Sequence, residues 1–327
     1  MVTRRKVLVG FGLGALSSAL PLFAQQGKVW RVGVLETTSK DLNSANYSAL
    51  RKGLQELGYV EGKNLLFEYR SADGRPEKFE ALASELARLK VDVILTRGTP
   101  ATHAASKLKG NIPVVTAASS TMVESGFAKS LSHPGGKVTG LDPFASDLFA
   151  KRVQLLKELL PKIARIGSLL DMGHPLSRAT WEDTATSARS LGVDTELLGY
   201  RKSEDLPAVF DLAVKQRVGA IIVGIGAISQ ANRAAIVALA ARHRLPAMYA
   251  SREFIDEGGL ISYAVSYPAL YYRAASFLDK IFKGAKPGDL PIERATKFEL
   301  VLNLKSAKAL GVTIPPSVRL RADEVIE

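Results

Sequence analysis

The chain has 327 residues, of which 46% are hydrophobic and 23% charged, a composition typical of a globular protein and long enough for two domains. It contains no cysteine, which excludes disulfides, thiolate nucleophiles, thiolate metal sites and an export signal processed at a lipid-anchored cysteine. The formal net charge is +12, but basic residues alternate with acidic ones and no basic run carries interleaved aromatics. No nucleic-acid partner is therefore expected.

The N-terminus has the pattern of an export signal. The stretch "MVTRRKVLVGFGLGALSSALPLFA" has a basic start, an apolar segment and the small residue Ala24 at a plausible cleavage point. This pattern predicts a signal peptide over residues 1–24 and a periplasmic protein. Thr3-Arg4-Arg5 partly matches a twin-arginine signal, so either export route is open.

The same stretch permits a second interpretation. Gly10, Gly12 and Ala15 spell G-x-G-x-x-A, the pattern of a dinucleotide-binding domain, and Glu36 follows where a ribose-binding acid is expected. The export interpretation is preferred because the strand before the glycines would be only three residues long. Pro21 would also interrupt the following helix.

Strands and helices alternate through the mature chain. The first half predicts strands at 29–35, 64–70, 91–96, 112–117 and 136–141, and helices around 47–57, over 76–90 and from 99. The second half predicts strands at 164–170, 193–200, 219–224, 245–250, 258–265 and 297–304. Its helices are predicted at 146–160, 177–191, 204–216, 229–243, 268–283 and 305–310. Such alternation indicates an α/β protein with two parallel sheets, a hinge and a cleft between them.

Three stretches resemble a family of periplasmic solute-binding proteins of ABC transporters, the tryptophan/tyrosine type. They are "GLQELGYVEGKNLLFEYRSADGRPEKFEALASELARLKVDVILT", "ARHRLPAMYASREFIDEGGLISYAV" and "KGAKPGDLPIERATKFELVLNLKSAKALGVTIPPSVRLRADEVIE". The resemblance implies a type I periplasmic-binding fold with two Rossmann-like lobes, three crossovers and no catalysis. It places the first lobe at 28–142 plus 267–295 and the second at 143–266 plus 296–327. The loops "DMGHP" (171–175) and "GIGAIS" (224–229) depart from the family pattern at ligand-facing positions.

The carboxyl ends of parallel strands nominate the ligand-binding residues. Those from the first lobe are Thr37, Thr38, Thr99, Pro100, Ala101, Thr102, Ala118, Ser119 and Ser120, and those from the second are Asp171, Gly226, Tyr249, Arg252 and Tyr263.

Thr99 and Pro100 suit the start of a helix, and the amides of Ala101 and Thr102 would then be free to bind a carboxylate. The simpler alternative is that this stretch only caps the helix. Ser119 and Ser120 would either donate to the same anion or satisfy the next turn.

The second-lobe candidates also have two interpretations each. Asp171 would face an ammonium group across the cleft, or it would cap helix 177–191. Tyr249 and Tyr263 would line the pocket and stack on a ring, or belong to the core. Arg252 would bind a carboxylate or pair with its neighbour Glu253, and the second is preferred.

Catalytic and metal sites are not expected. His103, His133, His174 and His243 show no metal-ligand spacing, and the chain has no G-x-S-x-G elbow and no Walker loop. The sequence therefore predicts a monomeric binding protein without cofactor that captures a small carboxylate-bearing solute, an aromatic or related amino acid, and delivers it to an ABC permease and its ATPase. A ligand-sensing regulator of the same fold and an NAD-dependent enzyme are the alternatives.

Overall fold

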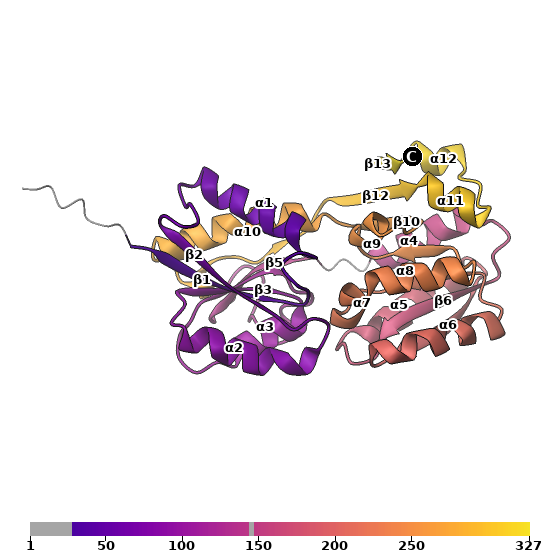
Figure 1. The fold of residues 1–327 in the computed structure, drawn as a ribbon. Coiled ribbons are helices and arrows are strands. Elements are labelled where there is room, and N and C mark those ends of the chain that lie inside the picture. The colour runs from indigo at the N-terminus through magenta and orange to yellow at the C-terminus, as the bar shows by residue number, and fades with distance from the viewer. Residues whose placement is uncertain (1–27, 144–146) are drawn as a thin grey trace, which may run out of the picture.

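The computed structural model describes residues 28–143 and 147–327, which form two lobes side by side (Figure 1). The signal peptide predicted at 1–24 lies outside these residues, as do the three positions of the alternative glycine pattern. Within the described ranges, no helix combines the length and the apolar character needed to span a bilayer.

The first lobe is built on a six-stranded parallel sheet of order β11-β5-β4-β3-β1-β2. Its strands are β1 (Trp30–Glu36), β2 (Leu65–Ser71), β3 (Val93–Arg97), β4 (Val114–Ala118), β5 (Val138–Asp142) and β11 (Glu293–Arg294). Its helices are α1 (Ser44–Glu56), α2 (Phe79–Arg88), α3 (Thr99–Ser106) and α10 (Tyr267–Phe282), with 3₁₀ turns at Pro76–Lys78 and Pro287–Asp289.

Helices cover both faces of this sheet. One apolar cluster joins the sheet to α1 and α10, and a second joins it to α2 and α3. In α1 the predicted spacing holds for Tyr47, Leu50 and Leu54, which are buried. Leu57 was expected on the same face but is exposed, because the helix has already ended at Glu56.

The second lobe is built on a seven-stranded sheet of order β13-β12-β10-β9-β8-β6-β7. Its strands are β6 (Arg165–Asp171), β7 (Asp194–Tyr200), β8 (Ala220–Val223), β9 (Ala247–Tyr249), β10 (Ile261–Val265), β12 (Phe298–Asn303) and β13 (Glu324–Ile326). Its helices are α4 (Asp147–Leu159), α5 (Ser177–Ser190), α6 (Leu206–Lys215), α7 (Ala227–Ala231), α8 (Arg233–Arg242), α9 (Glu253–Asp256), α11 (Leu304–Leu310) and α12 (Pro316–Arg319), with a 3₁₀ turn at Ser203–Asp205.

Two details of this lobe differ from the sequence prediction. Strand β12 pairs with β10 in the antiparallel direction, so the second sheet is mixed and not purely parallel. The helix predicted over 229–243 is two helices, α7 and α8, because the backbone leaves helical geometry at Asn232 (φ −110°, ψ 22°).

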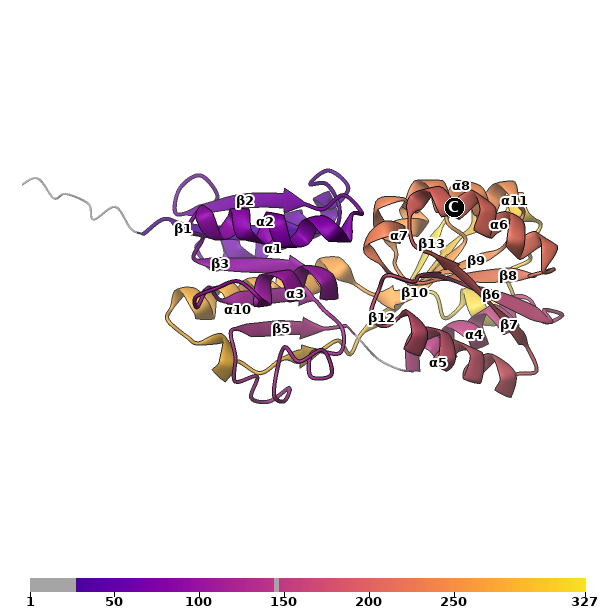
Figure 2. The ribbon, with the colours of Figure 1, turned by 90° about the horizontal axis from the view of Figure 1, so that it is seen from below.

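The chain passes between the lobes three times. It leaves the first lobe after β5, returns after β10 to form α10, and leaves again after β11 to form β12. Seen from below, the arrowheads of β2, β3 and β5 point towards the second lobe (Figure 2). The carboxyl ends of the first-lobe strands therefore face the second lobe, as the general rule for open α/β sheets requires of a ligand site.

Candidate functional site

Two adjoining cavities lie between the lobes. The apolar cavity, of about 110 Å³, is mainly a second-lobe space that reaches the faces of α4 and α5. The polar cavity, of about 50 Å³, lies against the start of α3. Both are lined by Ser120, Pro143, His174, Ile225 and Tyr267, so they are two ends of one cleft.

The start of α3 forms the first-lobe wall of the polar cavity. Gly98 precedes the helix with φ +88°, a conformation that favours glycine, and its amide donates to the carbonyl of Ala118 (2.6 Å). Thr99 and Pro100 follow and line the cavity, together with Ala118 from the end of β4. The predicted helix start is therefore present and faces the cleft.

Three residues that were predicted to bind the ligand lie behind the wall of the polar cavity: Ala101 and Thr102 in α3, and Ser119 after β4. Ala101 belongs to the core of the first lobe. The amide of Thr102 was expected to be free, but it donates to the carbonyl of Gly98 (3.0 Å), and the Thr102 hydroxyl donates to the same carbonyl. Ser119 is buried, with its hydroxyl 3.5 Å from that of Thr99. The first helical turn has already used one of the two amides assigned to the ligand.

The polar cavity contains buried hydrogen-bonding groups without partners. The Thr37 hydroxyl and both amide atoms of Gln230 are buried and make no hydrogen bond with any described residue. All of them belong to residues that line the cavity, and Gly226 lines it as well. Because buried polar groups are normally paired, these atoms are positioned for a ligand or water. Thr38, the neighbour of Thr37, lines a separate outer pocket between the lobes.

The apolar cavity contains one buried cation. Arg152 on α4 is only 5% exposed, and its Nε donates to the carbonyl of Tyr263 (2.8 Å). None of the ion pairs formed by described side chains includes Arg152, and burial lowers its pKa to about 10, so it stays protonated at neutral pH. Ser168 on β6 lines the same cavity, and its buried hydroxyl has no partner among the described residues.

His174 lines both cavities as a neutral side chain. Burial lowers its pKa to about 4, and its Nδ1 accepts a hydrogen bond from the amide of Leu176 (3.2 Å). The proton of the neutral ring is therefore on Nε2, which makes that atom a donor. Among the described residues that line either cavity, none is acidic.

Four second-lobe candidates do not line either cavity. Asp171 is buried and accepts a hydrogen bond from the backbone amide of Gly173 (2.9 Å), in its own loop. Burial raises its pKa. Tyr249 belongs to the core and stacks on Phe254 with ring centroids 4.9 Å apart.

The other two lie towards the surface. Tyr263 packs against Phe298 and lines an outer groove, although its carbonyl accepts the hydrogen bond from Arg152. Arg252 forms ion pairs with Asp256 and Glu324. The expected pairing of Arg252 with Glu253 is wrong, because Glu253 instead meets the first lobe.

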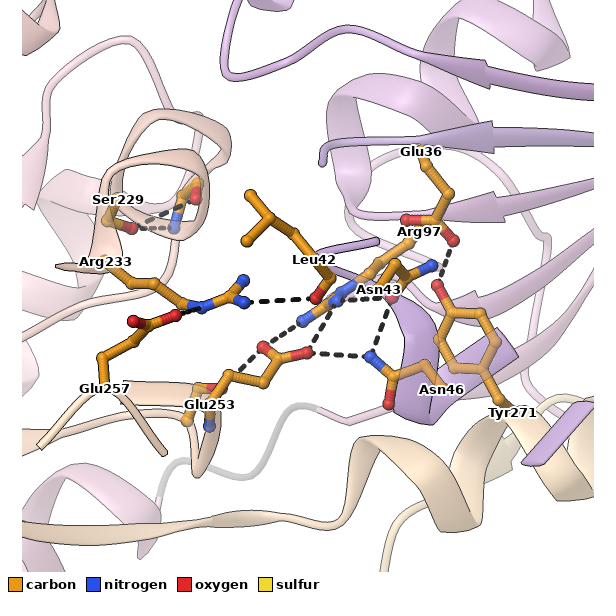
Figure 3. Close-up of polar contacts among 12 residues, drawn as sticks. Glu36, Leu42, Asn43, Asn46, Arg97, Ser229, Arg233, Glu253, Glu257 and Tyr271 are labelled. Atoms are coloured by element: carbon orange, nitrogen blue, oxygen red, sulfur yellow. Dashed lines mark hydrogen bonds and ion pairs between the residues drawn. The ribbon is translucent and has the colours of Figure 1, made fainter. Parts of the chain in front are cut away.

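An ion pair joins the two lobes beside the polar cavity (Figure 3). Arg97, at the end of β3, forms two hydrogen bonds with Glu253 of α9, Nη1 to Oε1 at 3.0 Å and Nη2 to Oε2 at 2.7 Å. Asn43 accepts from Arg97 (3.2 Å), while Asn46 and Ser251 donate to Glu253 (2.8 and 2.9 Å). We call these five residues the interlobe network. The bidentate geometry shows that the lobes are closed on this side.

A second contact closes the lobes nearby. Arg233 of α8 pairs with Glu257 (2.9 Å) and donates to the carbonyl of Leu42 in the first lobe (3.2 Å). In Figure 3 the Arg233–Leu42 contact, like the Arg97–Glu253 pair, crosses from the second-lobe ribbon to the first. The Ser229 hydroxyl accepts from the amide of Gly226 (2.8 Å) and so fixes the start of α7 at the interface.

Glu36 is buried beside the interlobe network and does not line the cleft. Its carboxyl group accepts a hydrogen bond from the Tyr271 hydroxyl. Burial raises its pKa to about 7, against the lowering effect of Arg97 and of the Tyr271 hydrogen bond. Its position at the end of β1 thus reflects packing at the lobe interface.

Several cleft residues were not predicted from the sequence: Phe149, Arg152, Ser168, His174, Thr180, Thr184, Gln230 and Tyr267. The loops "DMGHP" and "GIGAIS" were identified as ligand-facing departures, and they do bring His174, Gly224 and Ile225 to the cavities. Arg152 follows Lys151 in an amphipathic helix, so the sequence alone makes it look like a solvated surface residue.

Comparison with known proteins agrees with the two-lobed fold. The family model described as "ABC transporter substrate binding protein" matches residues 31–326. A "Tyrosine-binding protein" of Clostridioides difficile (strain R20291) is 24% identical over 274 residues, which cover 84% of this chain and 77% of that protein.

Solved structures are similar over most of the chain. A conserved domain protein of Vibrio cholerae O1 biovar El Tor is 27% identical, with 91% of this chain and all of that chain covered at a TM-score of 0.85. A Streptococcus pneumoniae protein solved in complex with L-Trp is 25% identical, with 91% and 99% covered at a TM-score of 0.83.

Proposed function

The chain belongs to the ABC transporter substrate-binding protein family, and from this premise we propose that it captures a small carboxylate-bearing solute between its lobes for delivery to a membrane permease. The family is one of binding proteins and not of enzymes, which removes the NAD-dependent enzyme suggested by the N-terminal glycine pattern. ATP would be hydrolysed on a partner subunit of the transporter.

One observation carries the proposal. The cleft is lined by residues from both lobes, while Arg97 of one lobe and Glu253 of the other hold it closed at one side. A ligand in this cleft would touch both lobes at once and would stabilise the closed form, which a permease can distinguish from the open form. The protein would act as a monomer, because each lobe supplies part of the same cavity.

The solute class rests on the relatives and on the lining. One relative is named for tyrosine and another was solved with L-Trp, so an aromatic or related amino acid is the first class to test. The cleft offers a carboxylate two sets of donors, the start of α3 with Thr99 and Ser120, and Arg152. Phe149, Leu170 and Ile222 would contact an apolar side chain.

The family is typically extracytoplasmic, and the segment 1–24 would direct the chain to the periplasm by the general or the twin-arginine route.

Thermal unfolding with a panel of amino acids and aromatic acids tests the proposal. A solute present at 100 times its Kd adds about 2.7 kcal/mol to the free energy of unfolding, so a true ligand raises Tm clearly. We expect at least one carboxylate of the panel to do so, and titration calorimetry to give one site per chain. A flat response to every carboxylate, with a response to neutral sugars, would contradict the proposal.

A further inference from the structure

The charges that line the cleft do not balance. Two arginines reach it, but Arg97 is neutralised by two hydrogen bonds to Glu253. Arg152 keeps its charge: among the described residues its hydrogen-bond acceptor is the backbone carbonyl of Tyr263, and none of the described lining residues is acidic. A buried cation without an anion costs free energy, so the described lining is short of one negative charge.

The other polar groups of the cleft are neutral. Gln230, Thr37 and Ser168 carry buried atoms without partners among the described residues, and His174 is a neutral donor. These groups suit a hydroxyl, carbonyl or amide of a ligand. An ammonium group would find no carboxylate among the described lining residues, whereas zwitterionic solutes usually need one because a buried charge must be paired.

From this balance we infer that the bound solute is a monoanion overall: a carboxylate that pairs with Arg152, an apolar body in the apolar cavity, and a neutral hydrogen-bonding group in place of an ammonium. The inference rests on the proposed function, since it assumes that the cleft is the binding site. It assigns the carboxylate to the second lobe, and leaves the start of α3 with Gln230 and Thr37 to hold the neutral group. Hydroxy acids related to amino acids have this chemistry.

Matched pairs of solutes test the inference, because they differ only at the group in question. L-phenylalanine and L-3-phenyllactate carry an ammonium and a hydroxyl on the same carbon, and L-leucine and L-2-hydroxy-4-methylpentanoate form an aliphatic pair. With the mature chain at pH 7.5, we expect calorimetry to give a Kd about tenfold lower or better for at least one hydroxy acid than for its amino acid. L-phenylalaninamide, which lacks the carboxylate, should not bind.

Substitutions of Arg152 test the carboxylate's partner. Arg152→Met keeps the apolar stem and removes the charge, so the Kd of the hydroxy acid should rise about 30-fold or more. In Arg152→Lys the Kd should lie between those of the unsubstituted protein and Arg152→Met. Because the unliganded protein loses an unpaired buried cation, its Tm should not fall. Arg252→Met, at an arginine whose partners are Asp256 and Glu324, is the matched control and should leave the Kd unchanged.

The outcomes separate this inference from the proposed function. Amino acids that bind as tightly as their hydroxy acids, or an unchanged Kd in Arg152→Met, would overturn the monoanion assignment and leave the binding function standing. No binding by either member of both pairs, and none by any other carboxylate, would overturn both.

Discussion

Two buried arginines near Tyr267 have opposite surroundings. Arg97 is 4% exposed and Arg152 is 5% exposed, so their burial is the same. Arg97 stacks on the Tyr267 ring (4.2 Å) and pairs with Glu253, and the charge of Glu253 keeps the pKa of Arg97 well above its ordinary value despite burial. Burial without an acid lowers the pKa of Arg152 to about 10. The role of a buried arginine therefore depends on the group with which it pairs and not on its burial alone.

The position of each partner explains the difference. Glu253 lies in the lobe opposite to Arg97, so this ion pair can form only when the lobes meet. Arg152 and its acceptor, the Tyr263 carbonyl, lie in the same lobe, so their contact does not depend on closure. The first arginine thus serves closure, and the second is available to the solute whether the cleft is open or closed.

Removal of the acid from the interlobe network should have the largest effect. In Glu253→Gln the closed form holds Arg97 without its carboxylate, at a cost of roughly 3 kcal/mol. The affinity for the tightest solute should fall about 100-fold in calorimetry. The unliganded protein should lose less stability in urea, because Arg97 can be hydrated when the lobes separate.

Glu324→Gln is the matched control, since Glu324 pairs with Arg252 of its own lobe, away from the contacts that join the two lobes. It should change the affinity less than threefold. Equal losses in the two variants would mean that the Arg97 pair has no special part in closure.

The second-largest effect is expected from Glu36, which should make the free energy of unfolding depend on pH. Its pKa is about 7 in the folded protein and 4.5 when unperturbed, so the folded state holds a proton that the unfolded state has lost between these values. Its stabilising contribution is complete below pH 4.5 and is lost as pH rises to about 7, by about 3 kcal/mol in total. Urea unfolding at pH 4.5, 6 and 7.5 should show this fall relative to Glu36→Gln, which does not titrate. Parallel curves for the two proteins would contradict the assignment.

A methyl group added between the lobes should have the smallest effect. Gly74 has φ +73°, and a Cβ on it would lie 2.6 Å from the Cβ of Ala231 in the second lobe. Gly74→Ala should therefore oppose closure and raise the Kd about tenfold, by calorimetry.

Gly62→Ala controls for backbone strain, because Gly62 has φ +82° and its Cβ would meet nothing within 4 Å. Both variants should lose about 1 kcal/mol of unfolding free energy, and only Gly74→Ala should lose affinity. A similar Kd in both would show that the lobes tolerate the added methyl.

The alternation of strands and helices could be predicted because hydrophobic periodicity is a local property. The direction of β12 could not, since an isolated strand pattern carries no information about its neighbour. The break at Asn232 was missed because the apolar pattern continues across it.

The candidate site could also be predicted only where the evidence for a residue is local in the sequence. Thr99 and Ser120 were predicted to face the cleft because they follow the carboxyl ends of strands, and the structure places them there. Arg152 and Glu253 were not predicted, because a charged residue on a helix looks solvated until the element packed against it is known. Arg252 and Glu253 are adjacent in sequence, yet the turn of α9 sends them to different partners.

The three passages between the lobes also set the order in which a growing chain can complete them. The first lobe needs α10, which ends at Phe282, because α10 supplies part of the apolar cluster that it forms with α1 and the sheet. The second lobe needs β12, which ends at Asn303, before its sheet is continuous to β13. Neither half can therefore finish its core until the ribosome has made most of the protein, and a product truncated near residue 260 would leave both halves unfinished.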